Sequence, residues 1–464
     1  MTKSKKTLII LSLLTILLTS SFFWLNSLVS AVESGNATRS QFTHISRLGI
    51  KTMLYQRLDV YAEEDKRWQS IARTLGKTDG EVAFKLAKYY IDKQDKNSEV
   101  NRNIELWLLQ ASRLGHNKAK VALASIYVEK NKLSAAKKIL VPIKSNLYAL
   151  TLLIKISIMI GDHQKIEYYT KLFKKINSVN KNKAHQIFYK KLEKYNIINS
   201  SNIESGKRCL AKIAPFATNL DDLAYFDKLI SSSNLDPLKP YLCFSPVKYI
   251  SKIELNCHHS ENESIECNEA IWKNKNTLTN QRFVAVLFDK GGANVNAGIL
   301  YIDSDDNEKV FFHELTHLLG FIDEYPLPKN HLRCSAVQDS MFSHNIVILP
   351  RAYQGSRREV RKKILSQLPW AKYILTETRI ISNTTEGWML GTLVDEHDTV
   401  GAFIAESCNE KDFVAIRPLK QRTALRYFEE KFPSLYLQML ADNPERFLMP
   451  HYSKNVMKAL RAKK

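Results

Sequence analysis

The chain begins with a long apolar stretch that has no counterpart later in the sequence. Three lysines among the first six residues precede an apolar run over residues 8–23 that contains no charge. Small residues at positions 29–31 would suit a signal peptidase. We therefore expect residues 1–31 to be a signal peptide or an N-terminal membrane anchor, and the rest of the chain to be exported.

After the first eighty residues the apolar positions follow a helical pattern that repeats. Leu-Ala-Lys-Tyr-Tyr at residues 86–90 recurs 37 residues later as Leu-Ala-Ser-Ile-Tyr at residues 123–127. A period in the thirties with two helices per unit is typical of an α-solenoid, and an ordinary helical bundle is the alternative. The sequence predicts an α-solenoid N-terminal domain with helical repeats over residues 79–200, after a helical lead-in at 32–78.

A polar stretch rich in Asn, Ser and Lys covers residues 176–205, and we expect a domain boundary there. Residues 282–288 and 297–302 then form apolar runs of strand length, separated by a turn that contains Gly and Asn. The acidic cluster at 303–308 is expected to cap the next helix. It lacks the spacing of a twelve-residue calcium loop. Strands followed by a helix predict an α+β domain over residues 205–464.

Composition excludes several classes of protein. Of 464 residues, 44% are hydrophobic and 25% are charged, as in globular proteins, and Gly 15 and Pro 13 exclude a collagen-like chain. The net charge of +21 is concentrated in residues 1–200, where 34 Lys and Arg face 15 Asp and Glu. We interpret this excess as a solvated helical surface, with an anionic partner as the alternative. We see no aromatic–basic pattern or phosphate-binding Gly loop, so we expect no nucleic-acid partner.

Six cysteines lie in the second half of the chain. An even number of cysteines in an exported protein favours disulfide bonds, and six allow 15 pairings. His258 and His259 could hold a zinc ion, but a disulfide-closed surface loop is the favoured interpretation. Sequence neighbours suggest the pairs Cys209–Cys243, Cys257–Cys267 and Cys334–Cys408.

One predicted helix carries residues that indicate chemistry. His313 and His317 are one turn apart, so both imidazoles leave the same face and can hold one zinc ion. Glu314 beside them is placed to take a proton from a zinc-bound water. Gly320 can end the helix in a left-handed conformation and turn the chain back. Asp323 would then supply the third ligand and leave a fourth position open for water.

The segment at residues 313–323 resembles the long zinc motif of the metzincin metalloproteases, with Asp in place of the usual third His, as in snapalysin-type proteases. Its continuation into Asp-Glu-Tyr at 323–325 is similar to the IgA-peptidase-like metalloproteases. Weaker likenesses to that family follow at residues 368–370, 400–403 and 416–418.

The resemblance implies a zincin, metzincin-like fold for residues 205–464, although Thr316 stands where the family usually has Gly. It also implies a methionine turn beneath the zinc. Met341 is the candidate for that turn, and the stretch around Leu425 is the alternative. Tyr325 either polarises the scissile carbonyl or packs beside the helix, and packing is favoured.

The helical repeats resemble the Sel-like repeats of the tetratricopeptide superfamily. Trp107, Ala111 and Gly115 match the Trp, Ala and turn Gly that these repeats favour. Such arrays usually bind partners and do no chemistry, so the resemblance implies a protein partner for residues 79–175.

Together these patterns predict an exported zinc-dependent metalloendopeptidase that acts on a protein or peptide substrate. Two alternatives remain. One is a catalytically inert zincin-fold scaffold that binds partners through its repeats, and the other is a zinc amidase that acts on cell-wall peptides.

Overall fold

The computed structural model divides into two compact units. One consists of Met1–Ile156 with Tyr168–His185, and the other of Ser157–Glu167 with Gln186–Lys464. The structure describes residues 3–34, 36–49, 51–94, 102–180, 183–198, 209–257, 267–274, 281–288, 290–296, 298–327, 343–393 and 399–450, together with residues 334, 337 and 395.

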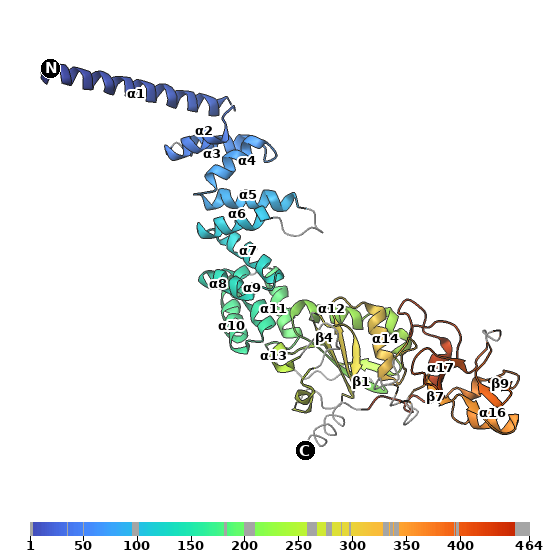
Figure 1. Ribbon diagram of the computed structural model, residues 1–464. Coiled ribbons are helices and arrows are strands. Elements are labelled where there is room, and N and C mark those ends of the chain that lie inside the picture. Colours follow the sequence, from blue (N-terminus) through green and yellow to red (C-terminus); the bar gives the residue numbers. More distant parts are fainter. Residues whose placement is uncertain are drawn as a thin grey trace. The chain divides into compact units, whose positions relative to one another are not determined.

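The described part of the chain before residue 199 is helical (Figure 1). Successive helices before residue 141 pack against one another, and their buried residues from Leu28 to Leu123 form one apolar core. The helices are α1 (Lys3–Glu33), α2 (Arg39–Arg47), α3 (Lys51–Val60), α4 (Lys66–Leu75), α5 (Gly80–Asp92), α6 (Arg102–Arg113), α7 (Asn117–Glu129), α8 (Leu133–Leu140), α9 (Leu147–Ile160), α10 (His163–Asn180) and α11 (Lys183–Lys194), with a short 3-10 turn η1 (Val141–Ile143) after α8.

The repeat seen in the sequence corresponds to equivalent helices. α5 and α7 each contain 13 residues, and they begin at Gly80 and Asn117. Within them Leu86 and Leu123 occupy matching positions, and both are fully buried. The N-terminal region is thus all-helical, with one helix pair, α5 and α6, followed by a second, α7 and α8.

Helix α1 differs from the other described helices because it is both long, with 31 residues, and apolar. Its segment Ser12–Val32 is long and apolar enough to cross a membrane. This composition suits a signal sequence or a membrane anchor, as the sequence predicts.

The second unit is built on a mixed sheet whose strands run in the order β2-β1-β4-β6-β5, with β3 also paired to β1. All pairings are parallel except that of β5 with β6. The two predicted strands are β4 and β6. Strand β5 lies between them along the chain and is an additional strand at the edge of the sheet. The strands are β1 (Ala211–Ala217), β2 (Leu242–Phe244), β3 (Lys248–Tyr249), β4 (Phe283–Phe288), β5 (Asn294–Asn296) and β6 (Ile299–Asp303).

Two helices cover the sheet: α12 (Leu220–Ile230) contacts β1 and β4, and α14 (Glu308–Leu318) contacts β5 and β6. Every residue of β4 and β6 is buried, as expected for strands covered on both faces. Two further elements near the sheet are the 3-10 turn η2 (Ser233–Leu238), which contacts α14, and the short helix α13 (Lys252–Leu255), which contacts the 3-10 turn η3 (Glu269–Asn274).

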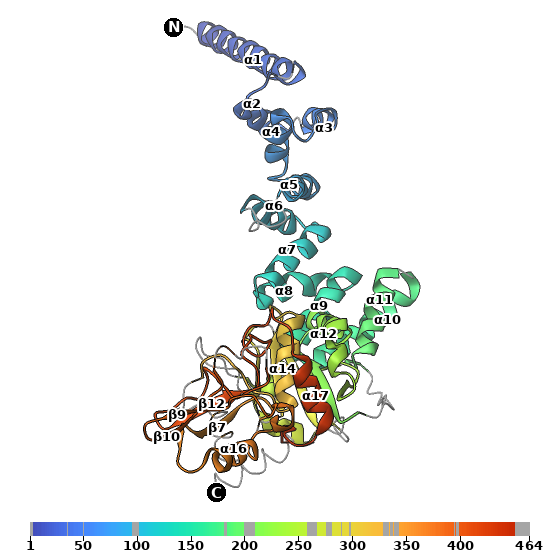
Figure 2. The ribbon, with the colours of Figure 1, turned by 90° about the vertical axis from the view of Figure 1, so that its right-hand side faces the viewer.

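Beyond α14 the described residues form two small three-stranded sheets and further helices (Figure 2). These elements are β7 (Val347–Pro350), β8 (Ala352–Tyr353), α16 (Arg357–Leu365), a 3-10 turn η5 (Ala371–Tyr373), β9 (Ile381–Thr384), β10 (Gly387–Leu390), β11 (Phe403–Ile404), β12 (Phe413–Arg417) and α17 (Ser434–Asp442).

The six cysteines form the three disulfides suggested by sequence neighbours: Cys209–Cys243, Cys257–Cys267 and Cys334–Cys408. Disulfides form in oxidising compartments, so together with α1 they fit an exported protein.

Candidate functional site

Helix α14 begins and ends with well-defined caps. The side chain of Asn307 accepts the N–H groups of Lys309 and Val310, so this residue of the acidic cluster caps the helix as predicted. At the other end Gly320 has φ +88°, and its N–H donates to the carbonyl of His317 at 3.1 Å. The N–H of Phe321 donates to Thr316 at 3.2 Å. This pair of bonds is a Schellman motif, which ends the helix and turns the chain back.

The reversal brings Asp323 beside the two histidines of α14. Asp323 Oδ1 lies 3.0 Å from His313 Nε2 and 3.1 Å from His317 Nε2. The two Nε2 atoms are 3.1 Å apart. All three residues are buried. Three atoms that can bind a metal therefore form a nearly equilateral triangle.

Backbone carbonyls fix the orientation of both imidazoles. His313 Nδ1 lies 2.8 Å from the carbonyl oxygen of Ala424, and His317 Nδ1 lies 2.9 Å from that of Phe321. A carbonyl oxygen only accepts hydrogen bonds, so each Nδ1 carries the proton. In a neutral imidazole each Nε2 then presents a lone pair toward Asp323, as in metal-binding histidines.

Two lone pairs and a carboxylate at this separation repel one another unless a positive charge lies between them. A metal ion supplies that charge, and so does a proton on one Nε2. In a tetrahedral zinc site with bonds of about 2.05 Å, adjacent ligand atoms are about 3.3 Å apart. The observed triangle is within a few tenths of an ångström of that value, so the donor set fits zinc.

Glu314 adds a carboxylate to this group. It is 5% exposed, and its Oε2 lies 3.9 Å from His317 Nε2. Among the described residues no group donates a hydrogen bond to Oε2. The ligand atoms of His313, Glu314 and His317 lie within 4.8 Å of one another. A buried carboxylate oxygen without a donor is available to accept a proton.

Tyr325 lies partly buried, two residues beyond Asp323. Burial, and to a smaller extent the negative charge of Glu314, raise the pKa of Tyr325 to about 12. Its hydroxyl therefore stays protonated and lies within the electrostatic range of Glu314.

The acidic cluster before α14 is held largely by hydrogen bonds to the backbone. Asp303 Oδ2 accepts the N–H groups of Gly291 and Gly292 at 3.0 and 2.8 Å, and Oδ1 accepts that of Asp305. Burial, with smaller contributions from neighbouring carboxylates, raises the pKa of Asp306 from 3.8 to about 6. These bonds are those of a structural turn that leads into the helix.

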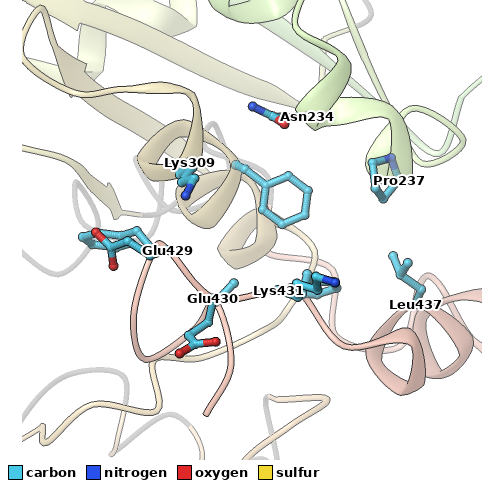
Figure 3. Close-up of a pocket in the computed structure, with 11 residues that line it drawn as sticks. Asn234, Pro237, Lys309, Glu429, Glu430, Lys431 and Leu437 are labelled. Carbon is cyan, nitrogen blue, oxygen red and sulfur yellow. The ribbon is translucent and has the colours of Figure 1, made fainter.

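A cavity of about 360 Å³ borders the site on the side of His313. Phe428 lines this cavity, and its ring meets the ring of His313 edge-on at 4.8 Å. Figure 3 shows side chains from η2, α14, the loop at 429–431 and α17 around it. The lining combines apolar with charged residues: Pro237, Phe312, Phe428, Phe432, Leu437 and Ala424, with Asn234, Lys309, Glu429, Glu430 and Lys431.

Several contributors to the site gave no signal in the sequence. The carbonyl of Ala424 has no residue-type signature, and Phe428 lies more than a hundred positions from His313. Arg417, noted only for its likeness to a family segment, pairs with the buried carboxylate of Glu324 at 2.6 Å. Two other such segments also meet, since Trp370 Nε1 donates to the carbonyl of Gly401 at 2.7 Å.

Met341, His258 and His259 lie outside the described residues. The alternative stretch for the methionine turn lies against the site: Ala424 bonds His313, and the carbonyl of Leu425 accepts the N–H of Glu324 at 2.9 Å.

Comparison with known proteins does not assign the chain. No protein-family model matches it, and no curated protein matches it significantly.

Proposed function

We propose that this protein is an exported zinc metallopeptidase. His313, His317 and Asp323 would hold the metal. The observation that carries this proposal is the triangle of Nε2 and Oδ1 atoms at 3.0–3.1 Å, with both Nδ1 atoms bonded to carbonyls. A fold with a parallel sheet, an antiparallel edge strand and this helix supports a metzincin-like α+β zincin domain.

The roles of the side chains follow from their positions. When bound, zinc supplies a Lewis acid that polarises a peptide carbonyl and makes a water molecule more acidic. Glu314 accepts the proton of the attacking water and passes it to the leaving amine. The Nδ1–H groups of His313 and His317 donate to the carbonyls of Ala424 and Phe321, which orients both rings so that each Nε2 would face the metal.

Two features beside the site suit a peptide. Strand β5 is the edge of the sheet, and among the described residues it pairs only with β6. An unpaired strand edge can bind an extended peptide by adding it to the sheet. The cavity next to His313, with Phe312, Phe428 and Leu437 in its lining, suits a large apolar side chain of that peptide.

The N-terminal helices are proposed to bind a protein partner as an α-solenoid. The group formed by His313, Glu314 and His317 lies on α14, which supports placing the proposed chemistry in the second unit. Helix α1 would direct the protein out of the cytoplasm and, if retained, would hold it at the membrane.

Zinc content and cleavage test the proposal together in the full-length protein. We expect about one zinc per chain in the wild type and in Glu314→Gln, and a large loss in Asp323→Ala. Cleavage of a quenched fluorescent peptide library should fall by about 10²–10⁴-fold in Glu314→Gln, because the general base is lost.

Glu308→Gln is the matched control, since Glu308 lies on the same helix but bonds Ser232 and Asn234. It should bind zinc and cleave peptides like the wild type. A folded wild type without zinc would refute the metal site. Zinc without cleavage would favour the inert scaffold, and release of fragments only from cell-wall peptides would favour an amidase.

A further inference from the structure

Glu324, the residue after Asp323, is a buried carboxylate with an unusually complete set of partners. It is 1% exposed. Oε2 accepts from Arg417 Nη1 at 2.6 Å and Thr423 Oγ1 at 2.9 Å. Oε1 accepts from Asn345 Nδ2 at 3.1 Å and from the hydroxyl of Tyr436. A buried charge is tolerated only with such compensation. Through these four hydrogen bonds the carboxylate connects parts of the chain that are far apart in sequence.

The partners of Glu324 also shape the segment that follows β12. Arg417 Nη1 and Nη2 donate to the carbonyls of Gln421 and Lys420 at 3.2 and 2.9 Å, which closes a turn. Thr423 Oγ1 accepts the N–H of Leu425 at 3.2 Å. The ion pair and the threonine therefore set the path of the backbone on both sides of Ala424.

The backbone at residues 424 and 425 is linked to two members of the metal-binding triangle. The N–H of Glu324 donates to the carbonyl of Leu425 at 2.9 Å, and the preceding carbonyl, that of Ala424, accepts from His313 Nδ1. On the other side Glu324 is bonded covalently to Asp323, whose carbonyl accepts from Ser407 Oγ at 3.2 Å. One carboxylate thus restrains a ligand and the carbonyl that orients another ligand.

We propose that Glu324 is a positioning residue that sets the affinity of the site for zinc. It acts through Arg417 and Thr423, which hold the Ala424 carbonyl against His313, and through the backbone, which holds Asp323. This inference rests on the proposed zinc site. Mutation of a group that orients a metal ligand without itself contacting the metal typically lowers metal affinity 10–100-fold.

The test measures zinc affinity by competition with a chromophoric chelator, using the full-length protein and zinc ions as the probe. Glu324→Gln keeps the shape of the side chain and removes the charge, and we expect zinc affinity to fall at least tenfold. Glu406→Gln is the matched control, because it removes the ion pair with Arg426, which lies only two residues from Ala424. We expect the control to bind zinc like the wild type.

A second pair of variants keeps the proposal falsifiable if Glu324→Gln fails to fold. Thr423→Val removes the hydroxyl and keeps the volume, whereas Thr423→Ser keeps the hydroxyl. We expect weaker zinc binding for Val and near-normal binding for Ser, with thermal unfolding of the zinc-free proteins as a measure of any general structural effect. A purely structural role would shift unfolding without separating the two variants in zinc affinity.

The outcomes separate this inference from the proposed function. A wild type that binds no zinc contradicts the proposed function. The positioning role alone is overturned if a folded Glu324→Gln variant binds zinc as tightly as the wild type. It is also overturned if Thr423→Val and Thr423→Ser have equal zinc affinities.

Discussion

Gly320→Ala tests the turn that returns Asp323 to the histidines. Gly320 has φ +88°, a region in which Ala costs about 1 kcal/mol more than Gly. A Cβ at this position would also lie 2.2 Å from the carbonyl oxygen of Phe447, which is backbone and cannot rotate away. The variant therefore requires the C-terminal segment around Phe447 to move.

That movement has a measurable cost. The same segment donates the N–H of Met449 to Leu318 at 3.0 Å, and its Met449 carbonyl accepts from Arg282 at 3.0 Å. Loss of two hydrogen bonds costs about 2 kcal/mol in total. With the backbone term, Gly320→Ala should destabilise the second unit by about 3 kcal/mol.

Gly292→Ala is the matched control. Gly292 has φ +71° and lies in the same unit, but a Cβ there meets nothing within 4 Å. We expect it to cost about 1 kcal/mol, from the backbone alone. Urea unfolding of both variants, with chelator present to exclude metal effects, gives the two values. Equal losses of unfolding free energy in the two variants would show that the Phe447 segment does not pack against the end of α14 as described.

Two further predictions concern pH. Asp306 holds its proton more strongly in the folded protein, so stability decreases as pH rises from 3.8 through about 6. Asp306→Asn should therefore gain about 1 kcal/mol relative to the wild type between pH 4 and 7.5, after allowance for its half-exposed position; a constant difference in urea unfolding would contradict this. His344 has the opposite sign, because burial lowers its pKa from 6.5 to about 4, and the stability it contributes above pH 6.5 is lost as pH falls toward 4. His344→Phe keeps a ring between Phe321 and Phe447. Between pH 6.5 and 4 this variant should lose about 3 kcal/mol less unfolding free energy than the wild type. Identical pH profiles of unfolding would show that His344 does not titrate there.

Local patterns in the sequence predicted the parts of the site that depend on neighbouring residues. His313 and His317 share a face because the α-helix has 3.6 residues per turn. Asn307 caps the helix and Gly320 ends it through bonds that span two to five residues. Such interactions depend on residue type and spacing alone, so they are visible without a structure. The pairing of each cysteine with its neighbour along the sequence, at separations of 34, 10 and 74 residues, was also predicted correctly.

Tertiary structure decided what surrounds that helix. The carbonyl of Ala424 and the ring of Phe428 reach His313 from more than a hundred residues away, and Arg417 reaches Glu324 across 93 positions. The same holds for the edge strand β5, whose three residues carry too little apolar patterning to be recognised. The sequence alone therefore determined the spacing of His313, His317 and Asp323. Packing of distant segments decided how His313 is oriented and what surrounds the ligands, because contacts between remote residues follow from the shape of the whole core and leave no periodic signal in the chain.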